Sequence, residues 1–369
     1  MRQGSLVGLA FLGICAAACG EGPTTPRPSP NVPTAAPRDT TVLEGLSRVR
    51  LYRLVDRLAA GRHGEVHSLI VQRNGVPVIE EYFSGGGAPL PHSLQSVTKS
   101  FGSALLGIAI DKGLVSDVDE RVLDFFPQWD EELRRDARRD RMRLKDILTM
   151  RTGTDYHEEG PDAPHWELNS LPTGWDLYWL RRRMIREPGS FWQYDSGGVI
   201  ALSSILKHRT GVHADVLADR WLFQPLGINE ARWFTNQEGH PHLGGGLSLT
   251  TRSMAKFGQL YLQGGTWNGQ QIVSQEWIQA SWERHVDFQV PATSSQHIRW
   301  YGYLWWILEP DPDGAGVQDI YAAVGAGGQF IFVIPEHQMV VAVTSDVQRG
   351  EQWTPVTWLY SDILPALLR

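Results

Sequence analysis

The chain has 369 residues, of which 42% are hydrophobic and 20% charged, the composition of a globular protein with a sizeable core. Its net charge is −7 at neutral pH, so electrostatics give no reason to expect a nucleic acid as a partner. Beyond the N-terminal segment the sequence holds no apolar run long enough to span a membrane.

The first 18 residues predict an export signal. Arg2 gives a positive start, and residues 6–18 form an apolar stretch too short for a permanent membrane span. The stretch ends in Ala-Ala-Ala before Cys19, which is similar to the lipobox of bacterial lipoproteins. Cys19 would then be lipidated and attach the protein to a membrane; ordinary cleavage after Ala18 is the alternative. Both of these predict a protein of the bacterial cell envelope, whereas a cytosolic start with chance apolarity is the remaining alternative.

Residues 19–41 are rich in proline and threonine and hold almost no bulky apolar groups. Such a segment cannot bury enough surface to become ordered, so it is predicted to be a tether. The folded domain is therefore expected to span residues 42–369.

The elements predicted for this domain change character along the chain. Residues 43–60 have apolar positions at helical spacing, and residues 67–83 favour two strands joined at Asn74-Gly75, a strong hairpin turn signal. A long apolar helix follows Ser96, and helical patterns dominate up to about residue 283. Strand patterns then return at residues 301–308, 328–334 and 339–344. Residues 353–368 predict a last helix. Strands at both ends with helices between them favour one antiparallel sheet with a helical insertion.

A Ser-x-x-Lys tetrapeptide marks the candidate nucleophile. Lys99 follows Ser96 by three positions at the start of the apolar helix, and residues i and i+3 of a helix share a face. Lys99 would therefore lie beside the Ser96 hydroxyl, where a desolvated and neutral lysine can take its proton. The sequence thus favours acyl transfer through Ser96.

The same tetrapeptide also begins at Ser204 and at Ser253, so its context must decide. Ser204 lies in the middle of a helical pattern, where its hydroxyl is expected to bond back to a carbonyl of the preceding turn. Ser253 lies in the first turn of another predicted helix. Only the helix after Ser96 is strongly apolar, and burial lowers the pKa of a lysine. The alternative at Ser96 is a plain helix start.

Two later stretches could complete a catalytic site. Tyr194 follows a Pro-Gly turn and precedes a pair of glycines, and a phenol near a lysine can relay a proton. The glycine-rich segment 325–328 lies directly before a strand and could bring an N–H close to a substrate. With the N–H of Ser96 it would form an oxyanion hole. The alternative for Tyr194 is a structural role as a core tyrosine, and the alternative for the glycine-rich segment is a tight turn into the strand.

Together and in this order, these stretches resemble the serine β-lactamase and penicillin-recognising superfamily. The likeness is strongest to its class C-like branch of esterases and aminohexanoate-dimer hydrolases, and it covers roughly residues 45–365. Further segments that carry it are residues 95–100, 147–153, 225–227, 244–251 and 301–306. The resemblance implies an α+β fold, in which an antiparallel sheet is flanked by helices and an all-helical insert occupies about residues 119–285.

The resemblance also implies roles for single residues. Ser96 would be acylated, Lys99 would act as the general base and Tyr194 as the proton shuttle. The N–H groups of Ser96 and Ala326 would hold the oxyanion. The substrate-binding positions that it implies are Ser196, Gly325, Gly327 and Gly328. It implies no cofactor.

Two departures from the family pattern bear on the substrate. Ser196 replaces the asparagine of the Tyr-x-Asn element, and no lysine or histidine opens the Lys-Thr-Gly equivalent near Gly325. In penicillin-recognising enzymes that cation helps to bind the substrate carboxylate. The departures favour a small ester or amide substrate over efficient β-lactam hydrolysis. The alternatives are a penicillin-binding carboxypeptidase or β-lactamase, and a non-catalytic binding scaffold tethered to the envelope.

Two further sets of residues have side chains suited to binding. Trp305 and Trp306 precede the glycine-rich segment, and one or both are expected to line an apolar acyl pocket. His240 and His242 form the densest histidine pair, but no third ligand stands at a recognisable spacing, so no metal is expected.

Overall fold

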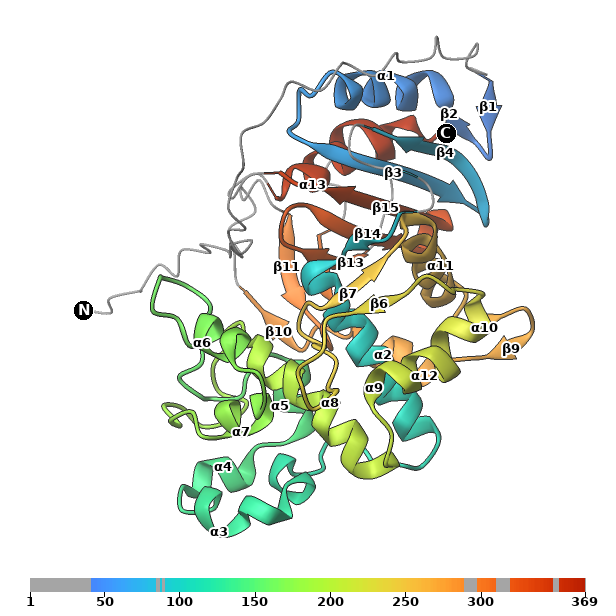
Figure 1. Cartoon of the computed structure of the whole chain (residues 1–369). Coiled ribbons are helices and arrows are strands. Elements are labelled where there is room, and N and C mark those ends of the chain that lie inside the picture. Colours follow the sequence, from blue (N-terminus) through green and yellow to red (C-terminus); the bar gives the residue numbers. More distant parts are fainter. Residues whose placement is uncertain are drawn as a thin grey trace.

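The computed structural model describes residues 41–83, 87, 90–288, 297–309, 319–347 and 352–368, so the expected signal and nearly all of the expected tether lie outside it. Its centre is an eight-stranded antiparallel sheet in the order β10-β11-β12-β13-β14-β15-β3-β4 (Figure 1). The strands are β3 (Val66–Arg73), β4 (Val76–Tyr82), β10 (Val286–Asp287), β11 (Ile298–Tyr301), β12 (Trp306–Leu308), β13 (Ile320–Gly325), β14 (Gln329–Ile334) and β15 (Met339–Ser345).

The two ends of the chain meet inside this sheet, because β3 pairs with β4 on one side and with β15 on the other. The turn between β3 and β4 is the predicted Asn74-Gly75 pair, and both residues have positive φ, at 53° and 76°. This backbone twist matches that of the flanking strands. The predicted sheet from both chain ends, within a mixed α+β fold, is confirmed.

Register decides which helices cover each face of the sheet. Ile331 and Val340 point to the face covered by α11 (Thr251–Leu262), which approaches so closely that a Cβ on Gly258 would lie 2.6 Å from Val340 Cγ1. Phe330 points to the opposite face and meets the ring of Trp353 at 5.8 Å. That face is covered by α13 (Thr354–Trp358) and α1 (Arg48–Ala59), as Figure 1 shows.

Helix α2 (Thr98–Asp111), which begins just after Ser96, lies deep in the molecule. It is apolar around most of its circumference, as expected for a buried helix. Phe101 stacks on Phe257 of α11 with ring centroids 3.7 Å apart. On another side of α2, Gly107 leaves room for the ring of Trp277, which a Cβ would overlap. The core around α2 therefore fixes where its first turn lies.

Residues 119–285 hold the predicted helices and also short strands. Two of them, β7 (Leu247–Leu249) and β6 (Arg232–Trp233), form a three-stranded sheet with the earlier β5 (His92–Ser93), and β8 (Thr266–Trp267) pairs with β9 (Gln270–Gln271). The remaining helices are α3 (Asp130–Leu133), α4 (Ala137–Arg141), α5 (Leu144–Leu148), α6 (Pro164–Ser170), α7 (Trp175–Leu180), α8 (Ser196–Thr210), α9 (Ala214–Ala218), α10 (Gln224–Leu226) and α12 (Gln275–Trp282). Within the described ranges, no helix is both long and apolar enough to cross a membrane.

Several predicted boundaries are wrong. The helix predicted from residue 43 begins at Arg48 in the structure, because β1 (Val42–Leu43) and β2 (Leu46–Ser47) form a hairpin before it. The predicted strand 301–308 is interrupted, since the chain turns at Leu304 with φ of 61°. Strand β13 was not predicted: its two alanines have weak strand preference.

Candidate active site

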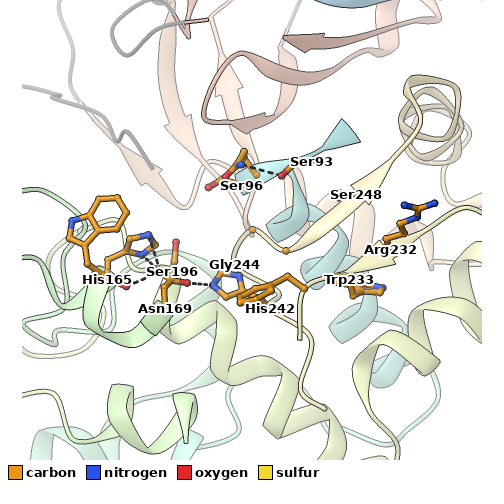
Figure 2. A pocket seen from close by; sticks show the side chains of 15 residues that line it. Ser93, Ser96, His165, Asn169, Ser196, Arg232, Trp233, His242, Gly244 and Ser248 are labelled. Carbon is orange, nitrogen blue, oxygen red and sulfur yellow. Dashed lines mark hydrogen bonds between the residues drawn. The ribbon is translucent and has the colours of Figure 1, made fainter. Parts of the chain in front are cut away.

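Ser96 lies in a tight turn, Gln95–Val97, that runs directly into α2. Gln95 has φ of 50°, a conformation that costs energy for a residue with a side chain. The turn aims Ser96 into a cavity of about 580 Å³, whose walls come from the small sheet, α6 and the start of α8 (Figure 2). Ser96 is thus a nucleophile candidate that a substrate can reach.

Lys99 lies one helical turn after Ser96 and is 1% exposed. Its Nζ is 2.8 Å from Ser96 Oγ and donates to the Gly244 carbonyl at 2.5 Å. Burial lowers the pKa of Lys99 to about 8, although the Glu158 and Asp195 carboxylates oppose the change. In its neutral form the amine can accept the Ser96 proton and still donate to Gly244.

The other two Ser-x-x-Lys tetrapeptides lie within the described residues and have different partners. Ser253 Oγ donates to Glu230 at 2.5 Å, and Lys256 Nζ donates to the Gly227 carbonyl at 2.8 Å. Ser204 lies in the middle of α8. Of the three tetrapeptides in the described part of the chain, the one at Ser96 brings lysine and serine into hydrogen-bond contact.

Tyr194 lies beside this pair. The Lys99 Nζ is 4.8 Å from the centre of the Tyr194 ring, and the Tyr194 hydroxyl shares a hydrogen bond with the Ser96 side chain. Burial, and then the Glu158 charge, raises the pKa of Tyr194 above its ordinary value of 10. Tyr194 therefore remains a neutral phenol that can relay a proton, while Lys99 is the group that more easily becomes a base.

The glycine-rich turn between β13 and β14 packs against the turn that holds Ser96. A Cβ on Gly325 would overlap the Leu94 carbonyl, so only glycine permits this approach. Gln329 fixes the turn from behind, because its side-chain amide donates to the carbonyls of Ala326 and Ser345. Among the described residues, the Ala326 N–H has no protein acceptor. It is available as the second oxyanion donor.

The remaining glycines of this turn, Gly327 and Gly328, have φ of 76° and 86° and form its tip. Ser345 Oγ donates to the carbonyls of both, at 2.6 and 2.9 Å. They shape the turn rather than line the cavity beside Ser96.

The two adjacent tryptophans point to opposite sides of the chain. Trp305 is fully buried against aromatic rings of α11, 4.7 Å from Tyr261 and 6.1 Å from Phe257. Trp306 stacks on the Tyr194 ring with centroids 6.1 Å apart. Neither lines the cavity beside Ser96. Trp305 is a core residue, and Trp306 supports the ring of Tyr194.

A buried carboxylate that the sequence did not predict, Glu158, acts electrostatically on Lys99 and Tyr194. Glu158 is 3% exposed and accepts a hydrogen bond from the Ser196 N–H at 2.9 Å. Ser196 itself is buried at the start of α8 and lines the cavity. The neighbouring Asp195 caps α8 by accepting from the Gly198 N–H at 3.0 Å. The sequence shows an acidic loop around Glu158, but nothing in that loop distinguishes Glu158 from the neighbouring acidic residues.

A neutral polar wall also escaped prediction. His242 Nε2 lies 2.8 Å from Asn169 Oδ1, and the Asn169 amide in turn contacts the His165 ring. All three line the cavity (Figure 2). Burial lowers the pKa of His165, and lowers that of His242 to about 3. Both imidazoles are therefore uncharged at neutral pH and can hydrogen-bond a substrate without adding charge.

A family model described as Beta-lactamase matches residues 52–360, so the chain belongs to the β-lactamase family. The resemblance predicted from the motifs is confirmed. A 6-aminohexanoate-dimer hydrolase of Paenarthrobacter ureafaciens is 25% identical over 287 residues, which cover 73% of this chain and 70% of that protein.

Two solved structures share the fold. One, provisionally assigned as a 6-aminohexanoate-dimer hydrolase of Bacillus anthracis, has a TM-score of 0.69 and 22% identity, covering 85% of this chain and 81% of its own. The other is EstCE1, a hydrolase with promiscuous acyltransferase activity, with a TM-score of 0.68 and 16% identity, covering 87% and 99%. Family and relatives support an enzyme of the serine hydrolase superfamily.

Proposed function

We propose that this protein hydrolyses an ester or amide bond through an acyl-enzyme on Ser96. The observation that carries the proposal is the buried Lys99 amine, 2.8 Å from Ser96 Oγ, with a pKa lowered to about 8. A serine needs such a neighbouring base before it becomes a useful nucleophile.

The reaction begins when neutral Lys99 takes the Ser96 proton and Ser96 Oγ bonds to the substrate carbonyl carbon. The carbonyl oxygen gains the electron pair of the broken π bond and is held by the N–H groups of Ser96 and Ala326. As the intermediate collapses, the bond to the leaving group breaks. The proton on Lys99 passes to that leaving group through Tyr194. Water then repeats the sequence on the acyl-enzyme and releases the acid and free Ser96.

The departures from the penicillin-recognising pattern support an ester or amide over a β-lactam. The β13–β14 turn carries glycines and Ala326 where that pattern has a cation, and Ser196 stands where it has an asparagine. Peptidoglycan carboxypeptidase or β-lactamase activity is therefore an outcome to be tested rather than the proposal.

Intact mass spectrometry of the purified full chain tests the nucleophile. We expect a fluorophosphonate to add once to the wild type and to Ser253→Ala, and not to Ser96→Ala. A stable penicillin adduct at Ser96 would favour the carboxypeptidase alternative. Absence of any adduct, together with absence of ester hydrolysis, would favour a non-catalytic scaffold.

We also propose that the chain is exported and lipid-anchored through Cys19. The support is the apolar stretch and the small residues that precede Cys19 in the sequence. Metabolic labelling with a fatty-acid analogue in a bacterial host should mark the wild type and not Cys19→Ser. Labelling of both would contradict attachment at Cys19.

A further inference from the structure

The cavity beside Ser96 continues over the small three-stranded sheet. Ser93 of β5 pairs with Ser248 of β7, and Ser248 pairs with Arg232 of β6. Residues paired across strands share a face, and all three line the cavity, as Figure 2 shows. They form a row, the Ser93–Arg232 row, that starts three residues before Ser96.

The charge of the cavity is concentrated at one end of this row. Among the fifteen residues that line it, Arg232 alone carries a permanent charge, since His165 and His242 are neutral. Arg232 is exposed and lines the cavity, and its guanidinium has no ion pair or hydrogen bond to any other residue that the structure describes. A guanidinium without a protein partner can bind an anion from outside.

The serines of the row can add hydrogen bonds. Gln95 Nε2 donates to Ser93 Oγ at 3.1 Å, which leaves the Ser93 hydroxyl proton free to point into the cavity. Ser248 presents a second hydroxyl between Ser93 and Arg232. An arginine fork with nearby hydroxyls suits a carboxylate, which accepts two parallel hydrogen bonds from a guanidinium.

We propose that the Ser93–Arg232 row binds a carboxylate of the substrate, so that the preferred esters or amides are those that carry a free acid group. The inference rests on the proposed function, because it names the substrate class of the Ser96 site. Adjacent strands are about 4.8 Å apart, so the Arg232 backbone lies about 10 Å from that of Ser93. The acid group would therefore be several bonds from the reacting carbonyl.

This row is separate from the place where penicillin-recognising enzymes hold a carboxylate. That cation belongs to the segment equivalent to Gly325, at the β13–β14 turn, whereas Arg232 projects from β6. This chain has no cationic side chain at the position of Gly325, and it has Arg232 along the cavity instead. A carboxylate at the row would select longer linear acids rather than bicyclic β-lactams.

Two matched pairs of esters test the proposal. The p-nitrophenyl monoester of glutaric acid is compared with p-nitrophenyl pentanoate, which places the acid in the acyl group. The acid 3-(butanoyloxy)benzoate is compared with its methyl ester, which places the acid in the leaving group. We expect wild type to favour the acid in one pair by about fivefold to tenfold in kcat/KM, mainly through KM.

Arg232→Gln should abolish this preference, because kcat/KM should fall about fivefold more for the acid member of the pair than for the neutral member. Arg232→Lys should keep part of it, and Arg53→Gln, which removes an exposed arginine from α1, should keep all of it. Equal kcat/KM for acid and neutral members in both pairs, or an equal loss for both members in Arg232→Gln, would overturn the proposal.

Calorimetry with glutarate separates this inference from the proposed function. We expect glutarate to bind wild type at least fivefold more tightly than Arg232→Gln, and this result needs no turnover. Hydrolysis of neutral esters that depends on Ser96, with identical glutarate binding by both proteins, would retain the hydrolase and reject the carboxylate site. Weaker glutarate binding by the variant without ester hydrolysis would do the reverse.

Discussion

Glu158 accepts a hydrogen bond from the Ser196 N–H at 2.9 Å, and its other carboxylate oxygen lies 3.9 Å from Nδ1 of His165. The side chains of Glu158 and His165 are both buried. The carboxylate thus joins the loop before α6 to the first residue of α8, directly after the Tyr194-Asp195 pair. Burial has the larger effect on both nearby groups, lowering the pKa of Lys99 and raising that of Tyr194, and the Glu158 charge acts to raise the pKa of each.

The wild-type enzyme should be most active at alkaline pH. In the proposed mechanism the active form of Lys99 is the neutral amine, whose fraction rises as pH approaches and passes its pKa of about 8. We expect kcat/KM at pH 6 to be about a hundredfold below its plateau. Tyr194 should cause no decline below pH 10, because its pKa is raised above that value. A profile that stays flat from pH 6 to 9, with chemistry rate-limiting, would contradict Lys99 as base.

Replacing Glu158 by glutamine should move the rising limb of this profile to lower pH. The variant keeps an acceptor for the Ser196 N–H but removes a negative charge that raises the pKa of Lys99. Glu159→Gln, which changes an exposed neighbour, should leave the limb in place. A limb that moves to higher pH in Glu158→Gln would show that the carboxylate acts in another way.

Replacing Lys99 by methionine should lower kcat by about 10² to 10⁴, the usual contribution of a general base. Methionine fills the buried space with an apolar chain, so circular dichroism and the thermal midpoint should show a folded protein. Lys256→Met removes the lysine of another Ser-x-x-Lys tetrapeptide and should retain activity. Full activity in a folded Lys99→Met variant would remove Lys99 from the mechanism.

Replacing Tyr194 by phenylalanine should affect substrates according to their leaving groups. An alkoxide or amine needs a proton as it leaves, while p-nitrophenolate does not, so alkyl esters and amides should lose more kcat than p-nitrophenyl esters. We expect a loss of about 10² for the former. Tyr178→Phe, whose hydroxyl bonds to Glu167 at 2.7 Å, is the matched control. Equal losses for both leaving groups would argue against a proton relay.

Replacing Gly325 by alanine should damage the site and the fold together. The new Cβ overlaps the Leu94 carbonyl, so the turn that holds Ser96 must shift. Overpacking of this kind costs about 1–3 kcal/mol, and we expect a lower thermal midpoint and slower fluorophosphonate labelling of Ser96. In Gly102→Ala the new Cβ lies 3.7 Å from Leu243 Cβ, and the midpoint should be retained. An unchanged labelling rate in Gly325→Ala would contradict the packing of these turns.

The sequence best predicts the structural features that depend on residues close to one another along the chain. The Ser96–Lys99 contact follows from the spacing of a helix, and the β3–β4 hairpin follows from Asn74-Gly75 between β-branched runs. The sheet built from both chain ends follows from where strand patterns occur. These predictions use short-range geometry, which a single sequence contains.

The remaining parts depend on contacts between distant segments. Glu158 becomes important only when its loop reaches Ser196, and Arg232 only when the two-residue strand β6 pairs with β7. A strand of two residues has no pattern that can be recognised. Trp305 and Trp306 are identical in type, and no local pattern distinguishes Trp305, which packs against α11, from Trp306, the first residue of β12, which stacks on Tyr194.

The pairing of β3 with β15 has a consequence for synthesis. Residues 66–73 leave the ribosome more than 260 residues before their partner at 339–345, so the middle of the sheet cannot close on the growing polypeptide. The turn that supplies Ala326 is positioned by Gln329 and Ser345, which also arrive late. A nascent chain therefore carries Ser96 without the Ala326 N–H, the second oxyanion donor of the proposed mechanism, and should be inert toward esters until translation is almost complete.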